Sequence, residues 1–247
     1  MSRVAVVTGG ASGMGRSACE HLAAAGSDVA VLDLDGEAAL ATADHLTGAG
    51  VRSIGLQVDV ADREAVDRAY EQVRTQLGPI AILVTSAAVA SFVRFTDITV
   101  EEWERTLRVN LTGTFHCIQL ALPDMVGAGW GRIVTISSAA GQAGSRRQGH
   151  YSASKGGVIA LTKAVALEYG SKGITANTIP PAVVDTPMFR EAQAEGHVPD
   201  DEMLARMTPV GRLGAPDDIG AMCAYLCSDA ASYVTGQVIG VNGGAVT

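Results

Sequence analysis

Long apolar runs, basic residues and cysteines are all scarce in this sequence of 247 residues. No apolar run approaches the roughly 18 residues that a membrane-spanning helix needs, so we expect no membrane span. Lys and Arg total 18 against 26 Asp and Glu, which gives a net charge of −8. This acidic balance argues against nucleic acid or an anionic membrane surface as the main partner.

The four cysteines, Cys19, Cys117, Cys223 and Cys227, fit a reducing compartment as small buried hydrophobic residues. Cys223 and Cys227 lie four residues apart on an expected helix. No His or Cys pair nearby completes four metal ligands, so we expect no metal site. The first apolar run is too short for a signal peptide and no cleavage-like site follows it. We therefore expect a cytoplasmic protein.

The sequence does contain enough apolar material for a large core, because 47% of its residues are hydrophobic and 18% are charged. Short apolar runs alternate with helical patterns and are apolar at successive positions, which is typical of parallel strands that helices cover on both faces. The runs span residues 4–7, 29–32, 54–60, 80–84, 132–136, 174–179 and 237–241. We predict an α/β single-domain Rossmann fold over residues 1–247, with a seven-stranded doubly wound parallel sheet.

A glycine-rich turn follows the first run and opens the first expected helix. It reads Thr8-Gly9-Gly10-Ala11-Ser12-Gly13-Met14-Gly15. Glycines there allow a tight turn and the close approach of a pyrophosphate, which then sits at the helix N-terminus. Glycines alone are a weak signal, but the strand before and the helix after agree with it. We predict cofactor contacts from Gly9, Ser12, Gly13, Met14 and Gly15.

The residue that ends the second strand indicates which dinucleotide is bound. Asp33 stands where a carboxylate accepts hydrogen bonds from both ribose hydroxyls and repels a 2′-phosphate, and we expect its neighbour Leu34 in the same site. Ser12 offers no compensating positive charge, and Arg16 lies inside the helix. The pattern therefore favours NAD over NADP.

A second acidic residue, Asp59, ends the third strand together with Val60. A carboxylate and a backbone amide at that edge are placed to hold the adenine. Structural alternatives exist for both acids, since Asp33 would also serve as a cap for its strand end and Asp59 as a solvated turn residue.

Three residues form the expected catalytic group. Tyr151 and Lys155 are four apart, one turn along the same helix face. A cation there stabilises tyrosinate and lowers a phenol pKa whose ordinary value is about 10. Ser138 follows the fifth strand, at the carboxyl edge where open α/β sheets bind ligands. A Tyr-x-x-x-Lys pair is common by chance, but its combination with the glycine turn and the serine is specific.

Together these motifs resemble the short-chain dehydrogenase/reductase family over essentially the whole chain. The resemblance rests on Thr8-Gly9-x-x-x-Gly13-x-Gly15, Asp59, Asn110, Ser138, Tyr151-x-x-x-Lys155 and Asn177-x-x-x-Pro181. Residues 231–244 are similar to the subgroup of 3-oxoacyl reductases and secondary-alcohol dehydrogenases. The family implies NAD(P)-dependent hydride transfer between a carbonyl and an alcohol, and the subgroup implies a homotetramer.

The resemblance also implies a role for each residue. Tyr151 would be the acid/base, Ser138 would hydrogen-bond the reacting oxygen, and Lys155 would hold the nicotinamide ribose and tune Tyr151. Asn110 would hold a proton-relay water beside Lys155, the alternative being a polar helix residue that bonds its own backbone. Further cofactor contacts are implied for Ser86, Ala88, Tyr151, Pro181, Val184 and Thr186.

Two departures from the family pattern concern the cofactor. Thr85-Ser86-Ala87-Ala88 replaces the usual Asn-Asn-Ala-Gly, so Ala88 adds a methyl where the backbone passes the cofactor. Pro181-Ala182 replaces the usual Pro-Gly and requires a backbone conformation at Ala182 that an alanine adopts without strain. We expect these changes to alter cofactor affinity or sheet stability and to leave the chemistry in place.

The segment 187–214 interrupts the rhythm of strands and helices, and we predict that it is a substrate lid. The expected substrate pocket is apolar, which suits a hydrophobic ketone, alcohol or acyl chain, although its methionines equally fit ordinary packing. Arg146 and Arg147 are placed to meet an anionic tail, or they belong to an exposed charged loop. The pocket residues are 89–92, Ala139, Ala140, Val183, Met188, Phe189, Met203 and Met207.

Three functions remain open. The first is an NAD-dependent oxidoreductase that interconverts a secondary alcohol and a ketone on a mainly hydrophobic small-molecule or acyl substrate. The second is a 3-oxoacyl-thioester reductase, acting on acyl carrier protein or coenzyme A esters with NADPH. The third is an inactive dinucleotide-binding protein, against which the joint presence of Ser138, Tyr151, Lys155 and Asn110 argues.

Overall fold

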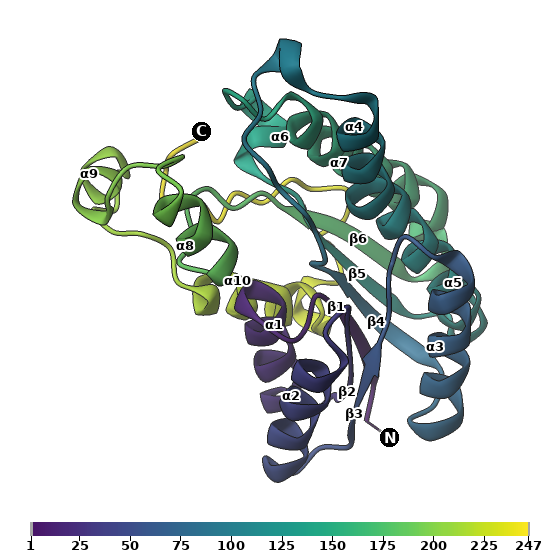
Figure 1. Ribbon diagram of the computed structural model, residues 1–247. Helices are drawn as coiled ribbons and strands as arrows, with labels where there is room; N and C mark the ends of the chain where they lie inside the picture. Colours follow the sequence, from purple (N-terminus) through teal and green to yellow (C-terminus); the bar gives the residue numbers. More distant parts are fainter. Residues whose placement is uncertain (1, 247) are drawn as a thin grey trace.

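A six-stranded parallel sheet forms the centre of the computed structural model, which describes residues 2–246. The strand order is β3-β2-β1-β4-β5-β6 (Figure 1). All strands run parallel, and the order in which successive strands are added reverses between β1 and β4. This is the doubly wound arrangement that the alternating pattern predicts. The strands are β1 Val4–Thr8, β2 Asp28–Asp33, β3 Ser53–Gln57, β4 Ile80–Thr85, β5 Gly131–Ile136 and β6 Ile174–Ile179.

The prediction of a seventh strand at residues 237–241 is wrong for the described chain. That segment pairs with β6 through a single parallel bridge, between Thr178 and Val238. The Asn177 side chain lies between the two segments, donating to Val234 O at 2.7 Å and accepting from Gln237 N at 3.1 Å. A side chain thus takes positions that backbone groups would take in a regular ladder. The third strand also ends earlier than predicted, at Gln57, so Asp59 and Val60 belong to the turn that follows.

Helices cover both faces of the sheet, which explains why its strands are apolar at successive positions. In β1, Val4 and Val6 join the core under α3, α5 and α7, whereas Ala5 and Val7 join the core under α1, α2 and α10. The covering helices are α1 Gly13–Ala24, α2 Gly36–Gly48, α3 Arg63–Gln76, α5 Gly113–Ala128, α7 Gly149–Tyr169 and α10 Pro216–Leu226. All four cysteines are buried.

The remaining elements are short. They are η1 Phe95–Asp97, α4 Val100–Leu107, the π-helical turn η2 Arg108–Thr112, α6 Ala139–Ala143, η3 Gly170–Lys172, α8 Pro187–Ala194, α9 Asp201–Met207 and η4 Asp229–Ala231. Helices α8 and α9 occupy most of segment 187–214 and project from the body on the left of Figure 1. Within residues 2–246, no helix combines the length and the apolar character required to cross a membrane.

Candidate active site

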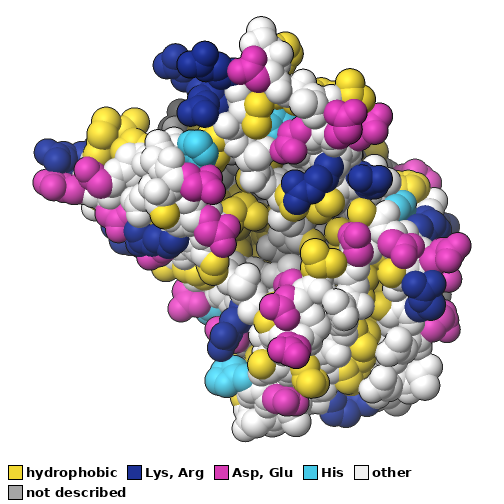
Figure 2. Space-filling view, in the orientation of Figure 1, with side chains coloured by type: hydrophobic (Ala, Val, Ile, Leu, Met, Phe, Trp, Pro, Cys, Tyr) yellow, Lys and Arg dark blue, Asp and Glu magenta, His cyan; other side chains and the backbone are white. Residues whose placement is uncertain are grey.

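A cleft of about 610 Å³ opens at the carboxyl ends of β1, β2 and β4. Figure 2 shows the face of the molecule on which it lies, hollowed between the α8–α9 segment and the body. This is the position at which open α/β sheets bind their ligands. Most of the predicted cofactor contacts line it: Gly9, Ser12, Gly13, Met14, Asp33, Leu34, Asp59, Val60, Ser86, Ala88 and Thr186.

The glycine turn packs so closely that two of its positions exclude a side chain. A Cβ atom on Gly15 would lie 2.0 Å from Gly9 O, and a Cβ on Gly9, whose φ is +66°, would lie 2.8 Å from Ala87 N. Gly15 is therefore part of the turn itself and does not line the cleft. Ser12, at the N-cap of α1, makes no side-chain capping bond, and the first turn of α1 carries no acidic residue. This unneutralised helix N-terminus beside a bare backbone fits a dinucleotide pyrophosphate.

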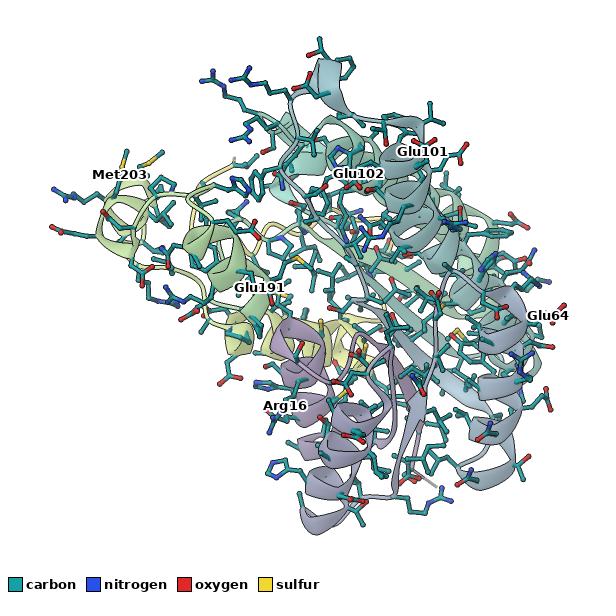
Figure 3. All side chains as sticks on the ribbon, in the orientation of Figure 1. Arg16, Glu64, Glu101, Glu102, Glu191 and Met203 are labelled. Carbon is teal, nitrogen blue, oxygen red and sulfur yellow. The ribbon has the colours of Figure 1, made fainter. Side chains whose placement is uncertain are left out.

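Backbone hydrogen bonds hold the Asp33 carboxylate at the rim of the cleft. Oδ2 accepts from Ala11 N at 3.0 Å and Oδ1 accepts from Asp35 N at 3.2 Å. Arg16, labelled in Figure 3, donates to Glu20 on its own helix at 2.9 Å. Among the described residues, the carboxylate has no cationic partner within salt-bridge distance, and its position suits ribose hydroxyls.

The turn after β3, which contains Asp59 and Val60, packs against α5. The Asp59 carboxylate accepts from Ala61 N at 2.9 Å, so it also stabilises its own turn. His116 on α5 lies with Nδ1 3.1 Å from Val60 O, and a Cβ on Gly113 would lie 2.8 Å from the Val60 side chain. The sequence analysis missed His116, because its contact with Val60 depends on how α5 packs against the turn.

Ser138, Tyr151 and Lys155 meet at the end of β5. Ser138 lies two residues after the strand and caps α6, its Oγ accepting from Ala140 N at 3.1 Å. Tyr151 and Lys155 occupy the first two turns of α7. Lys155 Nζ donates to Ile136 O at 2.9 Å and lies 5.8 Å from the centre of the Tyr151 ring.

Burial determines the protonation of this pair. Burial raises the pKa of Tyr151, and the nearby Ser138 hydroxyl acts in the opposite direction. Burial also lowers the pKa of Lys155 to about 8. The lowered phenol pKa expected from Lys155 is therefore not found, because desolvation penalises both charged forms and the ammonium is directed to a backbone carbonyl. At neutral pH Tyr151 holds its proton.

Asn110 is fully buried in the π-helical turn η2. Its Oδ1 accepts from Val89 N at 2.8 Å, and its Nδ2 donates to Val89 O at 3.0 Å and to Ser154 Oγ at 3.1 Å. The side chain therefore ties the segment after β4 to α7. A π-turn within a helix is frequent at functional sites. The water-holding role of Asn110 stays a prediction.

Comparisons with known proteins agree with this geometry. Residues 9–246 match a family model described as enoyl-(acyl carrier protein) reductase. The 3-oxoacyl-(acyl-carrier-protein) reductase FabG of Aquifex aeolicus is 37% identical over 243 residues, which covers 98% of this chain and 96% of the relative. The chain belongs to the short-chain dehydrogenase/reductase family. It is an NAD(P)-dependent oxidoreductase that acts on hydroxyl or keto groups.

Other members of the family differ in what they act on. The D-threitol dehydrogenase of Mycolicibacterium smegmatis is 38% identical over 242 residues, covering 98% of this chain and 92% of the relative. The crystal structure of gox2181 matches with a TM-score of 0.92 at 34% identity, covering 99% of this chain and 95% of that chain. Family membership therefore leaves the substrate of this short-chain dehydrogenase/reductase open.

The two departures from the family pattern are accommodated without strain. Thr8 Oγ1 accepts from Ser86 N and Ala87 N at 3.2 and 3.3 Å, so the segment after β4 is held without asparagine side chains. Among the described residues other than glycine, only Arg147 has a positive φ, so Ala182 needs no glycine-like conformation. Pro181 and Val184 are buried and lie outside the cleft lining, and Pro181 O accepts from Ala139 N at 2.8 Å.

Some of the expected substrate residues line the cleft, and others lie away from it. Val89 and Met188 line the cleft. Met203 and Met207 are exposed on α9, and Met203 lies on its outer side (Figure 3), so these two do not form the pocket wall. Arg146 and Arg147 are both exposed, and Arg147 donates to Phe92 O at 3.2 Å.

Several cleft residues have no counterpart in the sequence analysis. Arg105 and Arg108, near Asn110, line the cleft and carry no sequence signal that separates them from other exposed helix residues. The others are Leu32, Val58, Ala61, Asp62, Ala87, Val109 and Pro187, which flank predicted residues.

Proposed function

We propose that this enzyme transfers hydride between NAD(H) and a secondary alcohol or ketone on a mainly hydrophobic small-molecule or acyl substrate. The observation that carries the proposal is the meeting of Ser138, Tyr151 and Lys155 at the end of β5, beside a cleft that fits a dinucleotide. A protein that only bound a dinucleotide would have no need of a half-buried tyrosine beside a buried lysine at this place.

The proposed mechanism assigns one task to each residue. Tyr151 takes the hydroxyl proton during oxidation and returns it during reduction. Ser138 hydrogen-bonds the reacting oxygen and stabilises the charge that develops on it. Lys155 would hold the nicotinamide ribose when the cofactor is bound. The bound nicotinamide supplies or accepts the hydride.

The raised pKa of Tyr151 makes the rates of oxidation and reduction depend differently on pH. Reduction uses the protonated phenol, which is present at neutral pH, whereas oxidation needs the phenol to lose its proton. We therefore expect the oxidation rate to rise with pH from neutral into the alkaline range, and the reduction rate to be highest near neutral pH.

The preference for NAD rests on Asp33. Its carboxylate is fixed at the rim of the cleft by Ala11 N and Asp35 N, and Arg16 is engaged by Glu20. A 2′-phosphate at this place would meet a negative charge with no cation from the turn to offset it. Titration of NADH and NADPH, followed by nicotinamide fluorescence, tests this preference, and tighter binding of NADPH would contradict it.

Tyr151→Phe tests the catalytic assignment. The variant removes only the phenolic oxygen, so we expect NADH binding to survive and turnover to fall at least about 100-fold. Tyr169→Phe, on the same helix and outside the site, is the matched control and should turn over like the wild type. Wild-type turnover by Tyr151→Phe would show that Tyr151 is not the acid/base.

A 3-oxoacyl-thioester reductase that uses NADPH is the second candidate. The identity with FabG of Aquifex aeolicus favours it, as do the exposed Arg105 and Arg108 at the cleft, which suit a substrate phosphate. Reduction of acetoacetyl-CoA with each cofactor separates the two candidates. Faster reduction with NADPH would favour the second one.

We also propose that the enzyme is a homotetramer that pairs α5 and α7 between subunits. Leu167 on α7 is 87% exposed and Phe115 on α5 is 41% exposed, so both helices present apolar side chains to solvent. Sedimentation equilibrium of the purified protein measures the mass directly. A monomeric mass would contradict the proposal.

A further inference from the structure

The segment after β4, residues 89–93, runs beside the start of α7 and is joined to it at several points. Asn110 bonds both backbone groups of Val89 and the hydroxyl of Ser154, which links η2, this segment and the second turn of α7. Farther along, Val93 N donates to Arg147 O at 2.7 Å and Arg147 donates to Phe92 O. Between these contacts lies a cluster of three polar side chains.

The cluster consists of Ser91, Glu102 on α4 and His150 on α7. Ser91 Oγ donates a short hydrogen bond to Glu102 Oε1 and lies 2.7 Å from His150 Nε2. The serine has one hydroxyl proton and gives it to the carboxylate, so His150 donates its Nε2 proton to the serine oxygen. His150 is fully buried, and its Nδ1 has no partner among the described residues.

The first turn of α7 needs such an anchor because its own cap is weak. Gln148, at the N-cap, makes no side-chain capping bond, and no acidic residue stands in the first turn. Arg147, just before it, has a φ of +61°, which is an unfavourable conformation for a residue with a side chain. An uncapped helix end frays unless tertiary contacts hold it. Tyr151 lies in this turn.

We propose that Glu102, Ser91 and His150 form a positioning network that fixes Tyr151 relative to the cleft wall. The proposal rests on the proposed function, in which Tyr151 is the acid/base. The network joins the segment after β4 to α4 and α7, and the contacts of Asn110 join the same segment to η2 and α7. Their α7 residues, His150 and Ser154, bracket Tyr151 in sequence. The helix turn that carries Tyr151 is therefore held on both sides of this residue.

His150 is fully buried and its contact with Ser91 is a directional hydrogen bond, which fixes the relative position of the two segments more narrowly than an apolar contact would. A contact that served packing alone gains nothing from this arrangement. A contact that sets the position of a reacting group benefits from a fixed geometry, because a misplacement of about 1 Å lowers a rate by up to about 100-fold.

The test compares Ser91→Ala and Glu102→Leu with two controls. Ser91→Thr keeps the hydroxyl and should restore most of the lost turnover. Glu101→Leu makes the same exchange on the neighbouring residue of α4, which is exposed and directed away from the network (Figure 3). For each variant we would measure kcat and KM for reduction of acetoacetyl-CoA by NADH, the Kd for NADH, and Tm.

We expect Ser91→Ala and Glu102→Leu to lower kcat by about 10- to 100-fold while KM and the Kd for NADH stay within about threefold. The double variant should lose little more than either single one, because both break the same chain of hydrogen bonds. A lower Tm with unchanged kcat would overturn the proposal, since it would show a structural role only. Independent, additive losses would also contradict it.

Two results separate this inference from the proposed function. If Tyr151→Phe keeps its turnover, the proposed function fails. If Tyr151→Phe is inactive while Ser91→Ala and Glu102→Leu keep wild-type kcat, only the network fails. Amide hydrogen exchange of the NADH-bound protein adds a readout without substrate. Faster exchange of residues 148–153 in Ser91→Ala than in Ser91→Thr supports the network, and equal exchange contradicts it.

Discussion

At the scale of a single residue, Gly15 leaves no room for a side chain in the glycine turn beside the cleft. A Cβ atom there would lie 2.0 Å from Gly9 O, a distance that no side-chain rotation relieves because Gly9 O is a backbone atom and the backbone of residue 15 fixes the Cβ position. We expect Gly15→Ala to weaken NADH binding at least about tenfold and to lower the free energy of unfolding by about 1–3 kcal/mol. Nicotinamide fluorescence and urea unfolding measure the two effects.

Gly127 on α5 is the matched control, since a Cβ atom there meets nothing within 4 Å. Gly127→Ala should leave NADH binding unchanged and stabilise the helix by up to about 1 kcal/mol. Equal effects of the two substitutions would show that the crowding at Gly15 has no bearing on the site.

At the scale of an element, the N-terminus of α10 depends on Asp218. Its carboxylate accepts from Ala215 N at 2.7 Å and from both Nη atoms of Arg212. The Arg212 hydrogen bond is the main reason that the pKa of Asp218 falls to about 2 from the ordinary 3.8. Asp218→Asn keeps an acceptor for Ala215 N but loses the charge, so we expect unfolding free energy to fall by about 1 kcal/mol at pH 7.

The sign of the pH dependence follows from the lowered pKa. The carboxylate stabilises the folded state above the ordinary pKa of 3.8, and this stabilisation is lost as the pH falls toward 2. The reason is that the unfolded chain takes up a proton at a higher pH than the folded protein does. The difference in the free energy of unfolding between wild type and Asp218→Asn, measured by urea unfolding, should therefore shrink as the pH falls from about 4 to about 2. Asp44→Asn, at an exposed position of α2, controls for the general effect of losing a carboxylate. A difference that is independent of pH would contradict the assignment.

At the scale of the whole molecule, Trp130 joins distant parts of the chain at the sheet edge opposite the cleft. The guanidinium carbons of Arg3 and Arg132 lie 3.8 and 4.2 Å from the centre of its ring. Arg132 is buried and also donates to the carbonyls of Gly173 and Ser228. We expect Arg132→Met to lower the free energy of unfolding by about 2–4 kcal/mol, because it leaves buried carbonyls unpartnered.

Arg3→Met removes the partly exposed arginine that contacts the same ring and should lower the free energy of unfolding by less than about 1 kcal/mol. Thermal and urea unfolding compare the two variants, and turnover per folded molecule should stay at the wild-type level in both. Equal losses of stability would show that burial of Arg132 does not decide the effect.

Local patterns predicted much of this protein. Successive apolar positions in runs such as 4–7 predicted a doubly wound parallel sheet, and the glycine turn, Asp33 and Asp59 predicted where the cleft lies. The prediction failed for a strand at 237–241, where the Asn177 side chain replaces part of the backbone pairing. A side-chain contact between segments about 60 residues apart leaves no trace in hydrophobic periodicity.

The sequence by itself determined which residues we propose for the chemistry, because spacing within one turn or one helix brings groups such as Tyr151 and Lys155 together whatever the rest of the chain does. Only the tertiary structure decided the protonation of these residues and the contacts that hold them in place. Burial, which depends on packing by the whole chain, raises the pKa of Tyr151 against the expected direction. The contact of Ser91 with Glu102 and His150 joins three separate segments, and no local pattern encodes it.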